Sequence, residues 1–224
     1  MLVDLSHTFE DGMPGFVMHA PDGSSAPFTA MVRPFLTHDQ SEPFYGGKAS
    51  FELTEVRFHT SIGTYIDSPR HRFRGMRDIS QLRLEELVLD GVVVHVPDAQ
   101  TEDAIGLDQM DLPENVVGKA VLFRFDWDQY WGNSAYDRYP YIGLDVIERL
   151  IAGRVKLVGV DAINVDDRKN PYRPAHTKFL SNDILIVENL ANLSSLPTSG
   201  FRFYAVPIKA KDATSMTVRA FAEM

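Results

Sequence analysis

Short apolar runs rich in β-branched and aromatic residues recur along the chain and predict strands. The predicted strands lie at Val3–Ser6, Phe28–Leu36, Phe51–Thr60, Gly91–Val96, Ala120–Phe125, Val155–Val160, Ile184–Val187, Phe201–Pro207 and Met216–Phe221. Two intervening stretches, residues 11–27 and 38–48, are rich in Gly, Pro, Ser and Asp. They predict long loops, and long ordered loops in a compact domain are often functional.

Apolar residues at helical spacing predict three short helices. One covers Leu82–Val88, a second covers Leu144–Ala152, and a third opens at Pro174, because proline is favoured in the first turn of a helix. Strands therefore outnumber helices, and no linker-like cluster separates the core strands. The pattern predicts a single α/β domain over residues 1–224, with more sheet than a doubly wound fold would have.

Composition narrows the class of protein. The chain has 224 residues, a net charge of −9 and no cysteine. The acidic balance argues against nucleic acid and anionic membranes as partners. Thiolate chemistry is excluded, so any metal would need His, Asp and Glu ligands. No apolar run approaches the length of a membrane span, and the first residues lack the regions of a signal peptide, so we expect a cytoplasmic protein.

The densest polar motif is the segment Ser61-Ile-Gly-Thr-Tyr-Ile-Asp-Ser-Pro-Arg-His71, which follows a predicted strand. Gly63 permits backbone geometry closed to other residues, and Pro69 keeps Ser68 out of the helical region. Asp67 and His71 are therefore expected on a rigid bend, where they can converge as a metal ligand and a general base, or as an acid orienting an imidazole. The alternative is a turn in which Asp67 only caps the backbone.

A second motif runs from His176, near the start of the third helix, to Glu188, directly after the apolar run Ile-Leu-Ile-Val. A carboxylate at the end of a buried strand needs a partner, and active sites of sheet proteins lie at such ends; the alternative is a solvated first residue after the strand. A third cluster over 161–168, rich in Asp and Asn, favours a solvated loop with internal Asx turns over a cation site.

Together these motifs resemble the cyclase superfamily, which includes bacterial kynurenine formamidases and isatin hydrolases. The family motif His-x-Gly-Thr-His-x-Asp-x-Pro-x-His is matched at Gly63-Thr64, Asp67, Pro69 and His71, and its Ile-Ile-Glu-Asn-Leu-like segment at Ile186–Leu190. The opening residues 3–7 and 12–14 are also similar. The resemblance implies a mixed, swivelling β/β/α fold with an open mixed sheet and short flanking helices, and a homodimer or homotetramer.

The resemblance also implies site roles, with one departure. In the family, one ion takes both motif histidines and the Asp, and a second takes the Asp, the downstream His and the Glu. Here the two histidine positions are Ser61 and Tyr65. The ligands of the second ion survive as Asp67, His176 and Glu188, and the family's proton donor and acceptor survives as His71.

We expect four residues to contact the substrate: Met13, Phe16, Ser61 and Thr64. His59 could replace a lost ligand but is expected to be structural. His7 is expected near a subunit interface or the site. The aromatic-rich stretch 125–141 is either ordinary core, a subunit contact or a lid over an aryl substrate.

Three functions remain open at this point. The first is hydrolysis of a C–N bond in an aryl formamide or cyclic amide of N-formylkynurenine type, with one zinc or manganese ion on Asp67, His176 and Glu188 and with His71 as proton shuttle. The second is a metal-free acid–base enzyme of cyclase or lyase type, in which Tyr65 and His71 act alone. The third is a non-catalytic relative that binds a small molecule.

Overall fold

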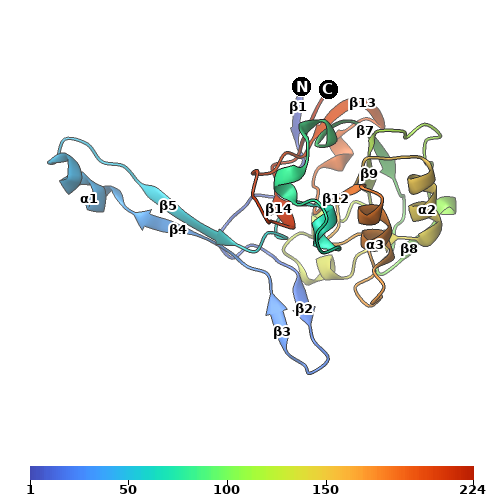
Figure 1. Ribbon diagram of the computed structural model, residues 1–224, viewed down its shortest axis with the longest axis horizontal. Helices are drawn as coiled ribbons and strands as arrows, with labels where there is room; N and C mark the ends of the chain where they lie inside the picture. The colour runs from blue at the N-terminus through green and yellow to red at the C-terminus, as the bar shows by residue number, and fades with distance from the viewer.

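The computed structural model describes residues 1–224 and contains one nine-stranded sheet with an extended arm (Figure 1). The strands of the main sheet are β1 (Leu2–Asp4), β6 (Tyr65–Asp67), β7 (Val88–His95), β9 (Ala120–Arg124), β11 (Leu157–Val160), β12 (Leu185–Glu188), β13 (Ser199–Tyr204), β14 (Ser215–Thr217) and β15 (Phe221–Glu223). Three two-stranded ribbons pair β2 (Val17–His19) with β3 (Ser25–Pro27), β4 (Ala30–Leu36) with β5 (Leu53–Phe58), and β8 (Ala104–Ile105) with β10 (Tyr141–Ile142).

The α-helices are α1 (His38–Ser41), α2 (Leu144–Ala152) and α3 (Pro174–Ser181). Short 3-10 turns cover Glu42–Tyr45, Pro69–His71, Ile79–Gln81, Leu84–Glu86, Leu107–Gln109, Asp128–Tyr130, Ser134–Asp137 and Leu193–Ser195. The predicted mixed α/β fold with an open mixed sheet and few short helices is confirmed. None of the helices has the length and apolar run needed to cross a bilayer.

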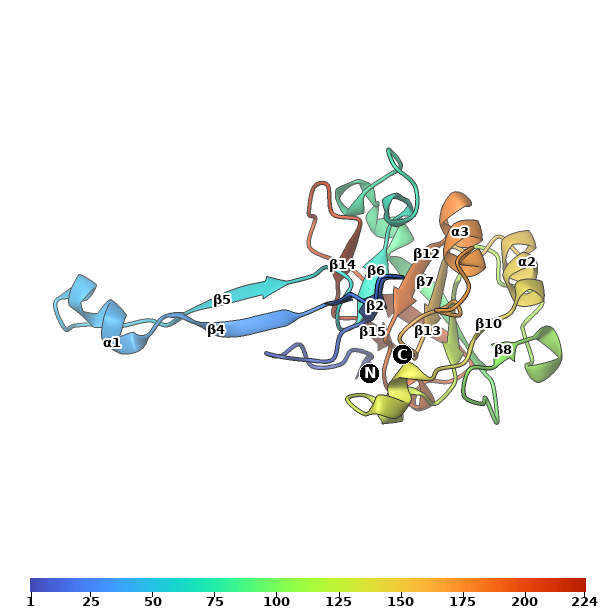
Figure 2. The same cartoon turned by 90° about the horizontal axis from the view of Figure 1, so that it is seen from below.

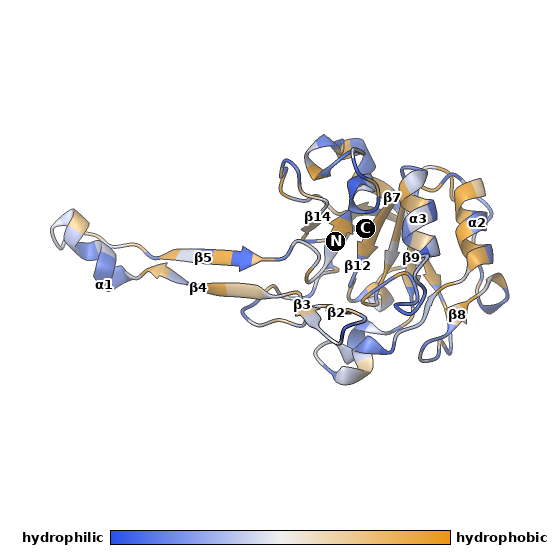
Figure 3. Ribbon diagram, turned by 60° about the horizontal axis from the view of Figure 1, so that its bottom comes forward, coloured by the Kyte–Doolittle hydropathy of each residue, from blue (hydrophilic) through white to orange (hydrophobic).

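The sheet is mixed, in the order β1-β15-β13-β7-β9-β11-β12-β6-β14, and its central strands β7, β9, β11 and β12 are parallel. Only three residues connect β14, at one edge, to β15, beside the other edge, so the sheet must curl until its edges approach each other. One apolar cluster fills the inside of this curl, and a second, larger cluster lies between the outer face and helices α2 and α3. Figure 2 shows these two helices on the same side of the sheet. Figure 3 shows the resulting apolar layers in the central strands and α2.

The predicted helices at 144–152 and from Pro174 are confirmed as α2 and α3. The predicted helix Leu82–Val88 is wrong: only Leu84–Glu86 forms a 3-10 turn, and Val88 already begins β7. The Glu86 carboxylate stabilises the start of this turn by accepting hydrogen bonds from the backbone and side chain of Arg83, and it also accepts from Arg77.

Two further strand predictions need correction. The run Met216–Phe221 is not one strand but contributes to β14 and β15, which lie at different edges of the sheet. The runs Phe28–Leu36 and Phe51–Thr60 form strands as predicted, but β4 and β5 pair only with each other. The stretch 38–48 is the tip of that ribbon, and 11–27 contains the β2–β3 hairpin rather than only loop.

Candidate functional site

Asp67 was expected on a bend with His71, but it lies at the end of the buried strand β6, between β12 and β14. The register of β6 places Tyr65 opposite Glu188 and Asp67 opposite Ile186. Residues two apart on a strand share a face, so Tyr65, Asp67 and Glu188 all point to the side covered by α3. Gly63 precedes the strand with φ +64°, and a β-carbon there would lie 2.9 Å from the terminal carbon of Met13.

Beyond β6 the chain makes the 3-10 turn Pro69–His71, which swings His71 back over Asp67. The His71 Nδ1 lies 3.5 Å from Asp67 Oδ1, and the His71 side chain is 32% exposed while that of Asp67 is fully buried. From α3, the His176 Nε2 approaches Asp67 Oδ2 and Glu188 Oε1, each at 3.6 Å. The structure thus brings Asp67, His71, His176 and Glu188 together, as the sequence predicts.

The loop between β11 and α3 orients His176. Asp166 accepts hydrogen bonds from the backbone N–H groups of Ala175 (2.7 Å) and His176 (3.0 Å) and from the His176 Nδ1 at 2.7 Å. The free N–H groups at the start of a helix need such an acceptor. The loop over 161–168 is not solvated as predicted, since Asp161, Asn164 and Asp166 are buried. The predicted Asx turn is present, because the Asn164 side chain accepts a hydrogen bond from the Asp166 N–H at 2.9 Å.

The charges around His176 favour a protonated imidazole in the absence of a cation. Burial alone would lower the pKa of His176, but Asp166, Asp67 and Glu188 outweigh it and raise the pKa to about 9. Burial raises the pKa of Glu188 to about 7, against the opposing effect of His176. Three carboxylates, Asp67, Asp166 and Glu188, thus surround a single buried imidazole.

Asp67 is the clearest sign of that imbalance, because neither of its carboxylate oxygens accepts a hydrogen bond although the side chain is fully buried. Buried carboxylates are normally paired by donors or by a metal ion. Donor atoms of Asp67, His71 and His176 all lie within 4.8 Å of one another. Neighbouring ligands of a tetrahedral zinc ion lie roughly 3.3 Å apart, so the residues present fit a divalent cation.

Glu188 is more constrained than Asp67. Its Oε1 accepts a hydrogen bond from the Val165 N–H at 2.8 Å, and its Oε2 accepts one from the Tyr65 hydroxyl. Burial and the neighbouring carboxylates Glu188 and Asp67 raise the pKa of Tyr65 well above its ordinary value, so this hydroxyl stays protonated. Its one proton is directed to Glu188 in this structure.

The four predicted substrate contacts separate into two pairs. Phe16 and Ser61 line a narrow recess above Tyr65, together with Pro14, Trp131 and Asn189. Met13 and Thr64 do not line it: Met13 is buried in a small apolar cluster with Ala30 and Ile62, and the Thr64 hydroxyl donates to the Asn189 carbonyl at 2.6 Å and accepts from the His7 N–H at 3.1 Å.

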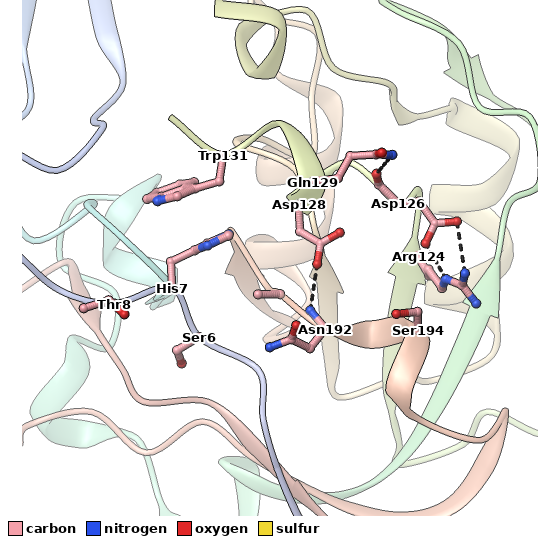
Figure 4. Close-up of a pocket in the computed structure, with 11 residues that line it drawn as sticks. Ser6, His7, Thr8, Arg124, Asp126, Asp128, Gln129, Trp131, Asn192 and Ser194 are labelled. Carbon is pink, nitrogen blue, oxygen red and sulfur yellow. Dashed lines mark hydrogen bonds and ion pairs between the residues drawn. The ribbon is translucent and has the colours of Figure 1, made fainter. Parts of the chain in front are cut away.

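Trp131 lines both this recess and an open polar groove of about 690 Å³, which Figure 4 shows. The His7 ring stacks on Trp131, with 3.9 Å between ring centroids, and so lies beside the recess rather than among the proposed ligands. His59 is exposed, and its Nδ1 accepts a hydrogen bond from the Thr29 N–H at 2.9 Å, in agreement with the structural role expected for it.

Sequence reasoning missed two residues of the site. Asp166 was placed in a solvated loop, although its position eight residues before Pro174 suits an acceptor for the start of α3. Asn189 lies in the family motif, and the sequence assigns it no role of its own. Its side chain accepts a hydrogen bond from the Tyr136 hydroxyl at 2.9 Å and donates one to the Gly63 carbonyl at 2.6 Å, which fixes the turn before β6.

Comparison with known proteins agrees with this geometry. Residues 3–167 match the family model described as Putative cyclase, and the chain belongs to that family. A kynurenine formamidase from Erythrobacter litoralis is 27% identical over 217 residues, covering 97% of this chain and 91% of that protein. An isatin hydrolase from Roseibium aggregatum is 27% identical over 186 residues, covering 71% of this chain and 70% of that protein.

Solved structures show the same fold. An isatin hydrolase A from Labrenzia aggregata, bound to benzyl benzoate, aligns with a TM-score of 0.82 at 22% identity, over 99% of this chain and 93% of that one. A structure described as a potential metal-dependent hydrolase with cyclase activity aligns with a TM-score of 0.74 at 18% identity, over 99% of this chain and 96% of that one. The expected cyclase-family membership and fold are thereby confirmed.

Proposed function

We propose that this protein hydrolyses a C–N bond in an aryl formamide or a cyclic aryl amide of N-formylkynurenine or isatin type. The observation that carries the proposal is the fully buried Asp67 carboxylate, without any hydrogen-bond donor, between two imidazoles. The names of the formamidase and isatin hydrolase relatives support the reaction class. The aromatic side chains of Phe16 and Trp131 beside Tyr65 support an aryl substrate.

One zinc or manganese ion would be held by Asp67 and His176 with one further protein ligand. That third ligand is Glu188 in the set that the family resemblance implies. The distances favour His71 instead, because its donor atom lies within 4.8 Å of those of Asp67 and His176, whereas both Glu188 oxygens already accept hydrogen bonds. A bound divalent ion would polarise the substrate carbonyl as a Lewis acid.

The protein's own groups would handle the proton. His71 is the only one of the four residues that reaches the surface, so it is the imidazole that an incoming substrate and water meet. As a general base it takes a proton from the water that attacks the carbonyl carbon, and it then donates this proton to the nitrogen as the C–N bond breaks. If His71 is a metal ligand, Glu188 is the remaining group able to accept that proton.

The metal-free alternative is less well supported by the geometry. To stabilise an oxyanion, the Tyr65 hydroxyl would first have to leave Glu188, and that would deprive a buried carboxylate of one of its two donors. A binding protein without turnover explains the aromatic recess, but it gives no reason for two imidazoles to face a buried carboxylate.

The test is turnover of N-formylkynurenine and of isatin by protein stripped of metal with a chelator and then given zinc or manganese. We expect turnover of at least one substrate, lost on stripping and restored by one of the ions. Turnover that is unaffected by stripping would support the Tyr65–His71 alternative. Absence of turnover of both compounds after reloading would contradict the proposed reaction.

Two matched variants then decide the third ligand. His71→Ala and Glu188→Gln are each analysed for bound metal after reloading. If Glu188 is the ligand, the Glu188→Gln protein loses the ion while His71→Ala keeps it and loses turnover. If His71 is the ligand, the ion is lost from His71→Ala and retained by Glu188→Gln.

A further inference from the structure

Arg173, the residue before α3, has an unusual backbone conformation. Its φ is 48° and its ψ is 61°, in the left-handed region, and the next residue is Pro174. A residue with a β-carbon rarely adopts this conformation, and the residue before a proline is normally extended. Among the non-glycine residues with positive φ, only Arg173 precedes a proline. Backbone strain of this kind persists where the surrounding structure requires it, and it is common at functional sites.

The strained backbone does not serve the start of the helix. Arg173 occupies the N-cap position, but its side chain makes no capping hydrogen bond. The N–H groups of Ala175 and His176 donate to Asp166 instead. The Asp166 Oδ2 lies 3.8 Å from the Arg173 Nε, and this carboxylate already accepts hydrogen bonds from three other donors. The guanidinium is therefore not needed to satisfy Asp166, and what the backbone conformation achieves is the placement of the Arg173 side chain.

The Arg173 guanidinium has more donors than the protein uses. Its Nη2 donates to the Asn164 Oδ1 at 2.7 Å, and the side chain makes no other hydrogen bond. Most of its N–H donors therefore have no acceptor in the protein, although the side chain is only 21% exposed. By comparison, Arg77 is 30% exposed and donates to three carboxylate oxygens of Glu86 and Asp183. The Arg173 guanidinium is thus held in place but left open to an acceptor from outside the chain.

Asn164 holds this guanidinium beside the aromatic recess. The residue before it, Ile163, lines the recess, and so does Tyr65. Burial and two neighbouring carboxylates raise the pKa of Tyr65, and the Arg173 charge opposes them. The positive charge is therefore close enough to act on a hydroxyl that lines the recess.

A second guanidinium, that of Arg168, lies against another wall of the recess. Its central carbon is 5.2 Å from the ring centroid of Phe16 and 5.6 Å from that of Tyr139. Its Nη2 donates to Asp137 at 3.0 Å, but its buried Nε has no acceptor. The chain as a whole carries a net charge of −9 and repels anions at long range. Two guanidinium groups with unused donors beside the recess provide a local exception, which suits an anionic ligand.

We infer that Arg173 binds a carboxylate group of the substrate, so that the substrate is an aryl amide carrying an anionic group in addition to the bond that is cleaved. The inference rests on the proposed function, and it selects the N-formylkynurenine type, which has a carboxylate, over isatin, which has none. A planar guanidinium matches a carboxylate with two parallel N–H donors. The backbone of Arg173 and the Asn164 side chain fix the guanidinium before the substrate arrives, which reduces the entropy lost on binding.

The experiment compares two ligands that differ only in the carboxylate. Kynurenine and kynuramine share the aryl ketone and the amine, and kynuramine lacks the carboxylate. In calorimetric titration of the wild-type protein we expect kynurenine to bind at least about tenfold more tightly than kynuramine. In Arg173→Gln the affinity for kynurenine should fall to that for kynuramine, and the affinity for kynuramine should not change. Arg74→Gln removes the same charge from an exposed side chain and is the matched control, which should bind both ligands like wild type.

The wild-type titrations test the inference without any variant. Equal affinity for the two ligands, or no binding of either, would overturn it. A parallel loss of both ligands in Arg173→Gln would show that Arg173 only supports the fold of the site, and would overturn it as well. Arg173→Lys keeps the charge but not the two parallel donors, so its affinity for kynurenine should lie between those of wild type and Arg173→Gln.

The outcome is separate from that of the proposed reaction, because these titrations need no turnover. If kynurenine binds through Arg173 but N-formylkynurenine is not hydrolysed, the proposed reaction fails and the anion site stands. If N-formylkynurenine and N-formylkynuramine are hydrolysed with equal kcat/KM, the reaction stands and the anion site fails.

Discussion

Two buried aspartates face the same imidazole from opposite sides, Asp166 at Nδ1 and Asp67 near Nε2 of His176. The loop before α3 supplies Asp166 with two backbone N–H donors and the imidazole N–H. Asp67, on strand β6, accepts no hydrogen bond, because its nearest imidazole nitrogens, His71 Nδ1 and His176 Nε2, lie 3.5 and 3.6 Å away. A carboxylate whose oxygens are satisfied positions its neighbour, whereas one without donors needs a cation, so equal burial gives these two residues different roles.

The largest expected effect on turnover comes from substitution of Asp67, the aspartate that accepts no hydrogen bond. Asp67→Asn keeps the shape of the side chain but removes its charge, and turnover should fall by about a thousandfold or more, because the proposed ion would lose a ligand. Steady-state rates with zinc or manganese in excess give the measurement, and circular dichroism checks the fold. Activity within tenfold of wild type would contradict the role of Asp67 as a metal ligand.

Substitution of Asp166, which accepts three hydrogen bonds, should have a smaller effect on metal binding and an additional effect on stability. In Asp166→Asn an amide replaces an acceptor of three donors, so we expect metal affinity to fall by roughly 10–100-fold and the free energy of unfolding to fall by roughly 2–3 kcal/mol. Metal titration and urea denaturation provide the two values. Asp167→Asn is the matched control, because its carboxylate accepts only from the Lys169 N–H in the structure. Equal behaviour of the two variants would contradict a positioning role.

The Tyr65→Phe variant tests whether the Tyr65 hydroxyl, which donates a hydrogen bond to Glu188, is needed for turnover. The metal-dependent account predicts turnover within about tenfold of wild type and a loss of roughly 1–2 kcal/mol in the free energy of unfolding, because only one hydrogen bond disappears. The metal-free account requires the Tyr65 hydroxyl and predicts a far larger loss of turnover. Rates of Tyr65→Phe, measured before and after metal stripping, separate the two.

The last prediction concerns stability alone and rests on His7, which is partly buried against Trp131 outside the proposed ligand set. Burial lowers the pKa of His7 to about 4. The unfolded chain takes up this proton below about pH 6.5, so the contribution of His7 to stability is complete above that pH and is lost as the pH falls through 4. At pH 5 the folded state should have lost roughly 2 kcal/mol. His7→Phe keeps the ring stack and should lack this part of the acid destabilisation in urea titrations at pH 7.5 and 5. A pH dependence equal to that of wild type would contradict the assignment.

Much of the sheet and the cluster of site residues could be predicted from the sequence. Strands such as Ala120–Phe125 and Ile184–Val187 were found because parallel strands buried on both faces appear as continuous apolar runs. The family motif correctly brought Asp67, His71, His176 and Glu188 to one place.

What could not be predicted depends on contacts between distant segments. Strand β6 has only three residues and is a strand only because β12 and β14 flank it. Asp166 is buried because it accepts hydrogen bonds from the N–H groups at the start of α3. Its imidazole partner, His176, lies ten residues further along the chain. The projection of β4 and β5 away from the sheet has no local signal, because their apolar alternation resembles that of core strands.

The most direct test of the account is calorimetric titration of metal-stripped protein with zinc and with manganese, for wild type and Asp67→Asn in parallel. The account predicts about one ion bound per chain in wild type and none at comparable affinity in Asp67→Asn. Folded wild-type protein that binds neither ion, or an Asp67→Asn protein that binds as well as wild type, would contradict the claim that Asp67 is held without donors to receive a cation.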